Sequence, residues 1–305
     1  MKKNFIVRVV CAALLYAAAA ALCAQAATPA SDFTYDINEA GDGVVIKSYR
    51  GKSTRVVIPA EIEDMPVKEI GYEAFFRCSG LKVLTFPKGL KTIGSYAFVD
   101  CSGLTALTFP EGLKSIGDFA FSGCSSLTAV TFPEGLKSIG SNAFSSCSSL
   151  TAVTFPEGLK TIGYAAFSDC SGLTAVTFPE GLESIGSYAF VDCSGLTALT
   201  FPEGLESIGD SAFSHCVGLT AVTFPEGLKT IGAFAFFDCS GLKALTFPEG
   251  LKTIGSYAFS GCSNLSSVGV PKTPIKYGDD AFARCTKLPL KERKKLKDAG
   301  YTGSF

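Results

Sequence analysis

Apolar residues recur along this chain with a fixed period of 23 residues, from about residue 56 to residue 285. One period, residues 101–123, reads C-S-G-L-T-A-L-T-F-P-E-G-L-K-S-I-G-D-F-A-F-S-G. Its L-x-x-L-x-F core predicts a short β-strand in which Leu104, Leu107 and Phe109 point inward. Self-similarity of this length is typical of a solenoid, where each coil buries its apolar side only against its neighbours.

The rest of the period predicts two further sides for each coil. Pro110 lacks an amide proton and ends the strand, and Leu113 and Ile116 then lie on a second short extended segment. The spacing of Ala120 and Cys124 suits one helical turn. The sequence therefore predicts an α/β repeat solenoid with a parallel β-sheet and few true helices.

Both ends of the repeat depart from this pattern. Phe33–Ile37 and Gly43–Tyr49 flank a turn-forming segment and predict a β-hairpin, which would cover the open edge of the first coil. At the other end, leucines among basic residues predict an amphipathic helix that closes the stack. We expect an N-terminal hairpin cap (27–55), ten coils (56–285) and a C-terminal helical cap (286–305).

The first 26 residues have the features of a signal peptide. A basic start precedes an apolar run over 9–22, and Ala24-Gln25-Ala26 supplies the small residues of a cleavage site. Lipid attachment at Cys23 is the less favoured alternative, because Leu22 stands where a small residue is needed. No later segment is apolar enough to span a bilayer. We expect an exported protein at the cell surface, in the outer envelope or secreted, with the periplasm as an alternative.

Charge excludes one class of partner. The chain carries 27 basic and 28 acidic residues, and without the leader 24 bases remain against 28 acids. Nucleic-acid binding needs a concentrated basic face, so we expect none. The one basic cluster, at 287–297, is interpreted as the polar side of the cap, with a patch for anionic polymers as the alternative. We expect a monomer.

Ten cysteines mark one place in every coil. An exported chain is usually oxidised, yet no C-x-x-C spacing exists that would bring two metal ligands together. Cysteine at an inward position packs as a small apolar group, so we favour buried free thiols, with a few adjacent disulfides as the alternative, and expect no metal or cofactor. The structural cysteine ladder comprises Cys78, Cys101, Cys124, Cys147, Cys170, Cys193, Cys216, Cys239, Cys262 and Cys285.

Catalytic motifs are missing from the sequence. There is one histidine, His215, which is interpreted as a tolerated surface residue, and no nucleophile, phosphate-loop or zinc motif accompanies it. The many glycine-containing triplets are turn glycines at the 23-residue period. We expect no enzymatic activity.

Two sets of residues are candidates for ligand binding. The outward side of the main sheet repeats threonine in two columns, which we interpret as the candidate ligand face. Its members are Thr105, Thr108, Thr128, Thr131, Thr151, Thr154, Thr174, Thr177, Thr197, Thr200, Thr220 and Thr223. A second column, two residues after a turn glycine, varies between coils and often holds an aromatic ring, which is favoured in recognition. This candidate variable edge comprises Tyr96, Phe119, Tyr188, Phe234 and Tyr257; half-buried packing is the alternative for these rings.

The repeat L-x-x-L-x-F-P-x-x-L-x-x-I-G-x-x-A-F-x-x-C resembles the BspA-like, treponemal-type leucine-rich repeat family of bacterial surface proteins. The resemblance covers 56–285, includes an extended first repeat with Met65-Pro66-Val67, and extends to the closing segment 300–305. It implies a leucine-rich-repeat horseshoe with a curved parallel sheet, and an exported adhesion or protein-interaction module. It implies no site residues, because the shared positions are core and turn positions.

These observations favour an exported, non-catalytic interaction module. We expect an adhesin that binds a protein or glycan of the host, of bacterial surfaces or of the extracellular matrix. The alternative is a passive structural or spacer component of the cell envelope, because the coils are so alike that no specific epitope is evident.

Overall fold

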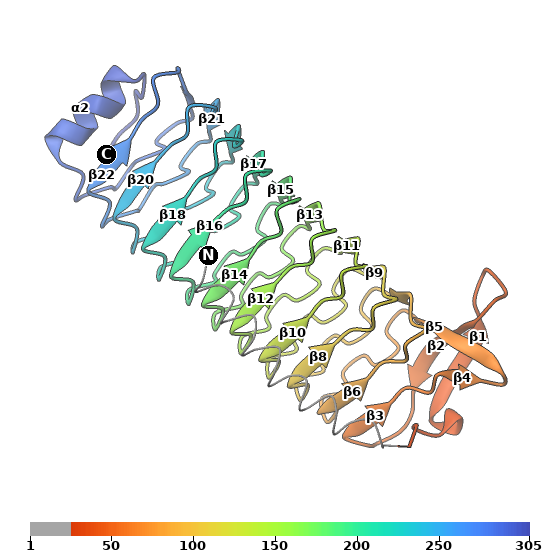
Figure 1. Ribbon diagram of the computed structural model, residues 1–305. Helices are drawn as coiled ribbons and strands as arrows, with labels where there is room; N and C mark the ends of the chain where they lie inside the picture. The colour runs from red at the N-terminus through yellow and green to blue at the C-terminus, as the bar shows by residue number, and fades with distance from the viewer. Residues whose placement is uncertain (1–25) are drawn as a thin grey trace, which may run out of the picture.

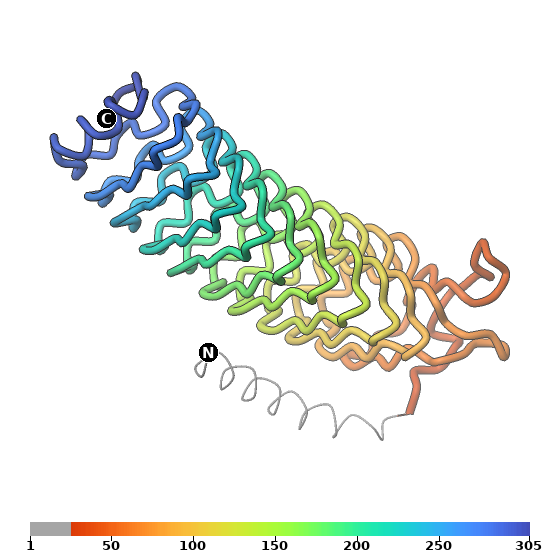
Figure 2. The backbone as a smooth tube through the Cα atoms, turned by 45° about the horizontal axis from the view of Figure 1, so that its top comes forward, coloured from red at the N-terminus to blue at the C-terminus, as the bar shows by residue number. Residues whose placement is uncertain are grey.

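The computed structural model describes residues 26–305, so the predicted leader lies outside the described part except for Ala26, and Cys23 lies outside it. Figures 1 and 2 show coils of nearly equal shape stacked along one axis, with the two ends of the described chain at opposite ends of the stack. Stacking buries each coil against the coils before and after it. The predicted solenoid of 23-residue coils is confirmed.

One side of the stack consists of short parallel β-sheets, built from the L-x-x-L-x-F segments, that follow one another along the axis. Paired strands of the regular coils are in register at a shift of 23 residues, as Ala129 pairs with Ala106 and Thr131 with Thr108. The strands are β3 (Arg55–Val57), β6 (Val83–Thr85), β8 (Ala106–Thr108), β10 (Ala129–Thr131), β12 (Ala152–Thr154), β14 (Ala175–Thr177), β16 (Ala198–Thr200), β18 (Ala221–Thr223), β20 (Ala244–Thr246) and β22 (Ser267–Gly269).

A second parallel ladder runs along the other extended segment of each coil. Its isoleucines point inward, as the spacing predicted, and Ile116 is almost fully buried. The strands are β5 (Met65–Ile70), β7 (Thr92–Ile93), β9 (Ser115–Ile116), β11 (Ser138–Ile139), β13 (Thr161–Ile162), β15 (Ser184–Ile185), β17 (Ser207–Ile208), β19 (Thr230–Ile231), β21 (Thr253–Ile254) and β23 (Lys276–Tyr277).

The third side of each coil is a turn and not the helical turn suggested by the sequence. Phe119 and Gly123 flank it with φ of 56° and 73°, in the left-handed region that cannot continue a right-handed helix. The backbone groups bond to the next coil instead: the N–H groups of Tyr96 and Phe98 donate to carbonyls of residues 118 and 120 at 2.8 and 2.7 Å. Successive coils are therefore hydrogen-bonded on all three sides.

Two columns of phenylalanine fill the core. In one column, fully buried rings stack with an offset, as Phe121 and Phe144 do with 5.2 Å between ring centroids and planes 10° apart. The other column meets it edge-on, as Phe132 meets Phe144 at 5.5 Å and 81°. Offset stacking combined with edge-to-face contact is the favourable geometry for aromatic rings, so the core is both dense and specific.

The N-terminal end is closed by a β-hairpin and by the segment around Thr28. The predicted hairpin forms from β1 (Phe33–Ile37) and β2 (Val44–Tyr49), and β2 pairs with β5, so the hairpin extends the second ladder. The strand β4 (Glu61–Ile62) also pairs with β5. The free edge of β3 in the first sheet is covered by Thr28, whose N–H donates to the carbonyl of Val57 at 2.9 Å. A 3-10 turn, η1 (Ala30–Asp32), joins Thr28 to the hairpin.

The C-terminal end is closed by the helix α2 (Leu290–Asp298), the one α-helix of the described residues. Glu292 accepts the N–H of Val268 in β22 at 3.1 Å, and Lys295 donates to the Val268 carbonyl at 2.9 Å. These two side chains also pair with each other at 2.9 Å, and the Lys295 ammonium holds the pKa of Glu292 below its usual range. The side chains of Glu292 and Lys295 thus provide the hydrogen bonds that a further strand would make to the edge strand. This part of the basic cluster therefore belongs to the C-terminal cap.

Candidate binding surfaces

The threonine face, defined as the two predicted threonine columns and the alanines between them, is an exposed and mostly ordered surface. All twelve predicted threonines are exposed. In the first column, hydroxyl groups donate to the carbonyl of the threonine one coil earlier, as Thr128 does to Thr105 at 2.9 Å and Thr174 to Thr151 at 3.0 Å. These hydroxyl groups are held by the backbone of the preceding coil, whereas the exposed threonines of the second column leave their hydroxyl groups to solvent.

Lysines end this face at both sides. Lys82 and Lys243 occupy the same column as Thr105, one coil before and one coil after its six threonines. At ~4.8 Å per coil and ~3.3 Å per strand residue, the face measures about 24 by 10 Å. A stable protein interface covers about 800 Å² on each partner, so a protein that binds here must also contact an adjoining edge.

The variable edge has a backbone feature that the sequence did not reveal. All five predicted residues are left-handed, with φ between 56° and 60°. Four of the rings stack in two pairs: Phe119 lies 4.9 Å from the ring of Tyr96, and Tyr257 lies 5.0 Å from that of Phe234. Stacking covers ring faces in these pairs, whereas Tyr188 is tilted against Tyr164 and is 41% exposed, so both predicted alternatives, exposure and half-buried packing, occur along this edge.

Other exposed apolar residues were missed by sequence reasoning. Tyr72 and Tyr164 are 59% and 51% exposed, and their rings are tilted against those of Tyr96 and Tyr188. Val217 is 47% exposed where most coils carry serine. Departure from the repeat was the available signal: each of these residues stands where the neighbouring coils carry a smaller or polar residue.

The ten ladder cysteines are free thiols in the structure, and all except Cys78 are buried. Each buried thiol donates to the carbonyl of the core phenylalanine in the preceding coil, as Cys101 does to Phe75 at 3.1 Å. Burial raises the pKa of Cys124 to about 12. No group of three or more potential ligands that could hold a metal ion occurs among the described residues. The geometry fits a packing role for these cysteines.

A thiol-reactive disulfide reagent should therefore modify at most one ladder cysteine in the folded protein, Cys78, which is half-buried. The thiolate is the reacting species, and burial disfavours it at the other nine sites. In denaturant all ten should react, and Cys78→Ser should remove the reactivity of the folded state. Fewer than ten thiols in denaturant without reductant would mean that disulfides form.

His215 lies half-buried with its ring edge-on to Phe237, at 5.5 Å between centroids. It is part of a shallow depression between coils, described below with its other residues. The described residues contain no helix that is long and apolar enough to cross a membrane.

Comparison with known proteins gives a consistent result. The family model described as BspA type leucine rich repeat region matches residues 52–174 and 160–289, in six copies. A leucine-rich repeat protein from Bacteroides ovatus is 25% identical with a TM-score of 0.64, covering 91% of this chain and 98% of its own. The pneumococcal vaccine antigen PcpA is 25% identical with a TM-score of 0.50, over 84% of this chain and 70% of its own.

A leucine rich cell surface protein from Faecalibacterium prausnitzii is 24% identical with a TM-score of 0.52, over 87% of this chain and 94% of its own. It supports the fold alone. No curated protein matches the chain.

Proposed function

Because the chain belongs to the BspA-type leucine-rich repeat family, we propose that it is an exported, non-catalytic adhesin. It binds proteins of the host surface, of other bacteria or of the extracellular matrix. The binding surface is the outward side of the main sheet, the threonine face. The repeat fold itself supports the coarser statement, a protein-binding module.

The observation that carries this proposal is the threonine face. Its backbone is hydrogen-bonded between coils, and the first threonine column is hydrogen-bonded as well, so little conformational entropy is lost when a partner covers it. Methyl groups supply apolar contact area, and the open hydroxyls of the second column supply hydrogen bonds. The face carries no charge of its own between Lys82 and Lys243.

Export is supported by the leader-like residues 1–26 and by the nature of similar proteins. One of the similar solved structures, 25% identical, is titled a vaccine antigen. Protease added to intact cells should therefore degrade the protein while a cytosolic marker stays intact. Full protection of the protein would contradict surface display and favour the periplasm.

A lysine in the middle of the threonine face should weaken binding without unfolding the protein. Thr151→Lys places there the residue that Lys82 and Lys243 already carry in the same column, so the fold should tolerate it within ~0.5 kcal/mol. Binding to immobilised matrix and bacterial surface proteins should fall at least tenfold, measured by biolayer interferometry.

The matched control is Ser138→Lys, which adds the same charge at an exposed position of the second ladder, where another coil carries Lys276. It should bind as the unsubstituted protein does. If the unsubstituted protein binds nothing in a broad panel, the adhesin proposal fails and the spacer alternative, favoured by the near-identity of the coils, takes its place.

A further inference from the structure

A periodic surface cannot by itself hold a partner in one register. Shifting a partner along the threonine face by one coil restores the same contacts, because six consecutive coils present Thr, Ala and Thr at the same positions. The face is also smaller than a stable interface. A specific complex therefore needs an adjoining contact where the repeat is broken.

The repeat is broken beside the last coil of this face. The residue after each ladder cysteine is serine in eight of the ten coils and threonine in the last, but in one coil it is Val217. One coil later, Phe237 occupies a column that holds serine in five coils, valine in two, alanine in one and phenylalanine in the first coil, as Phe76. His215 lies between them in the structure, edge-on to the Phe237 ring.

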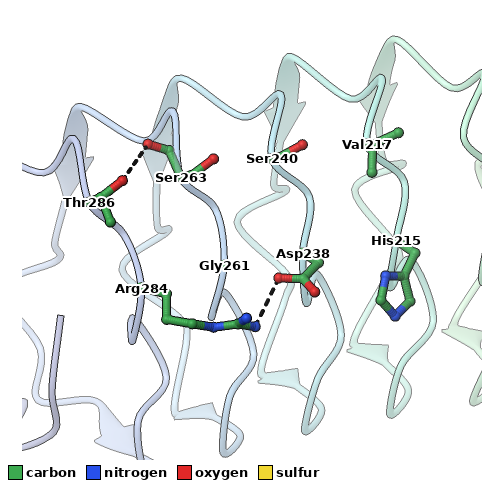
Figure 3. Close-up of a pocket in the computed structure, with 8 residues that line it drawn as sticks. All are labelled: His215, Val217, Asp238, Ser240, Gly261, Ser263, Arg284 and Thr286. Atoms are coloured by element: carbon green, nitrogen blue, oxygen red, sulfur yellow. Dashed lines mark hydrogen bonds and ion pairs between the residues drawn. The ribbon is translucent and has the colours of Figure 1, made fainter.

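His215 and Val217 border a shallow depression of about 510 Å³, shown in Figure 3. One row along it holds His215, Asp238 and Arg284, and a second row holds Val217 followed by hydroxyl side chains. Arg284 reaches across a coil to Asp238, with 2.9 Å between Nη2 and Oδ1. Arg284 can reach Asp238 because the residue between them in the column is Gly261, which has no side chain. A Cβ on Gly261 would lie only 1.8 Å from the same carboxylate oxygen.

The guanidinium of Arg284 also lies over the ring of Phe237, with 5.1 Å from Cζ to the ring centroid. It is more than half exposed, whereas Asp238 is about one third exposed. Arginine is enriched in binding hot spots, and here it lies beside an aromatic ring. The anchor patch, defined as His215, Val217, Phe237, Asp238 and Arg284, is continuous with the threonine face, because Val217 precedes Thr220 by three residues in one coil.

The charge of the surface changes sign along the stack, so the two sides of the anchor patch differ in charge. Residues 150–238 contain ten acidic and two basic residues, whereas residues 239–305 contain five acidic and eleven basic residues. In the column through His215, Asp169 and Asp192 precede the histidine. Asp238 and then Arg284 follow it, so the cation on this side lies at the far end and is paired with Asp238. An acidic group on a partner is repelled from the first side and attracted to the second.

We propose that the anchor patch is the register-setting contact for a protein partner whose segment carries an apolar side chain followed by a carboxylate. The apolar side chain packs on Val217 and Phe237, and the carboxylate lies toward Arg284. This inference rests on the proposed protein-binding function and names the partner's chemistry. A protein fits better than a glycan, because Val217 replaces a hydroxyl group that the other coils offer and the edge rings present few free faces.

The test uses a displayed library of random linear peptides, selected on the purified full chain. Enriched peptides should carry an aromatic or aliphatic residue next to aspartate or glutamate. Their affinity should fall at least tenfold on the double variant Val217→Ser with Phe237→Ser. Serine is the residue of neighbouring coils at both positions, so the variant should keep the fold, which circular dichroism and urea unfolding verify. On Arg284→Gln the preference for acidic residues should disappear and the apolar preference should remain.

The control is Val99→Ser, the same kind of change in the Phe237 column but near the other end of the stack, and it should leave peptide affinity unchanged. Peptides that bind the double variant as well as the unsubstituted chain would overturn the anchor patch, as would a failure to enrich any peptide. Binding of the unsubstituted chain to matrix or bacterial surface proteins is measured separately, so the adhesin proposal can stand when the anchor patch fails.

Discussion

Replacing Phe167 with alanine should lower the free energy of unfolding by about 3–5 kcal/mol, the cost of removing a fully buried aromatic ring. Phe167 has no exposed surface and lies in the middle of the stack. Its ring stacks on Phe144 at 5.3 Å and on Phe190 at 5.5 Å, and Phe155 meets it edge-on at 5.4 Å. The substitution therefore leaves a cavity that faces the core of three coils.

Urea unfolding followed by circular dichroism measures this effect, and hydrogen exchange locates it. Stability in a repeat protein is close to a sum of coil and interface contributions, so a central defect weakens two interfaces at once. Tyr164→Ala, in the same coil, removes a ring that is 51% exposed and should cost about 1 kcal/mol or less. Equal losses for the two variants would contradict the assignment of Phe167 to the core.

Replacing Gly255 with alanine should cost about 2–3 kcal/mol, although it adds only a methyl group. A Cβ on Gly255 would lie 2.4 Å from the backbone nitrogen of Ala233 and 2.5 Å from the carbonyl carbon of Gly232, in the preceding coil. Backbone atoms cannot rotate away as a flexible side chain can, so the two coils must separate locally. Overpacking of this kind typically costs 1–3 kcal/mol.

Gly89→Ala is the matched control, because the nearest atom to its Cβ is the Val67 carbonyl oxygen at an ordinary 3.6 Å. There the loss of chain entropy in the unfolded state should make alanine neutral or stabilising by up to ~1 kcal/mol. Both variants are compared by urea unfolding at one pH. If Gly255→Ala unfolds at the same urea concentration as the unsubstituted protein, the close approach of the coils at this column is not required.

Prediction from sequence was accurate where one coil carries the information. The inward positions Leu104, Leu107, Phe109 and Ile116 are all buried, because their spacing within the coil fixes which side of the strand they occupy. The hairpin and the terminal helix were also predicted from local patterns. The helical turn was not confirmed, since the left-handed residues on its flanks, such as Phe119, carry no distinctive residue type.

Prediction of the binding surfaces from the sequence was partial for a related reason. The threonine columns were found as a pattern, but whether a hydroxyl bonds to a carbonyl or faces solvent depends on the position of the preceding coil. The anchor patch was missed, and His215 was interpreted as a tolerated surface residue. The patch joins His215 and Arg284, 69 residues apart in the chain, and its ion pair spans a coil only because Gly261 lacks a side chain.

The sequence by itself determined the architecture: a stack of 23-residue coils with an apolar interior, a cysteine at one place in each coil and caps at both ends. A strict period does this because each coil can bury its apolar residues only against copies of itself. The tertiary structure alone decided the left-handed turn edge, the fixed threonine hydroxyls and the Arg284–Asp238 contact. These depend on atoms that belong to neighbouring coils, which only the stacking brings within contact distance.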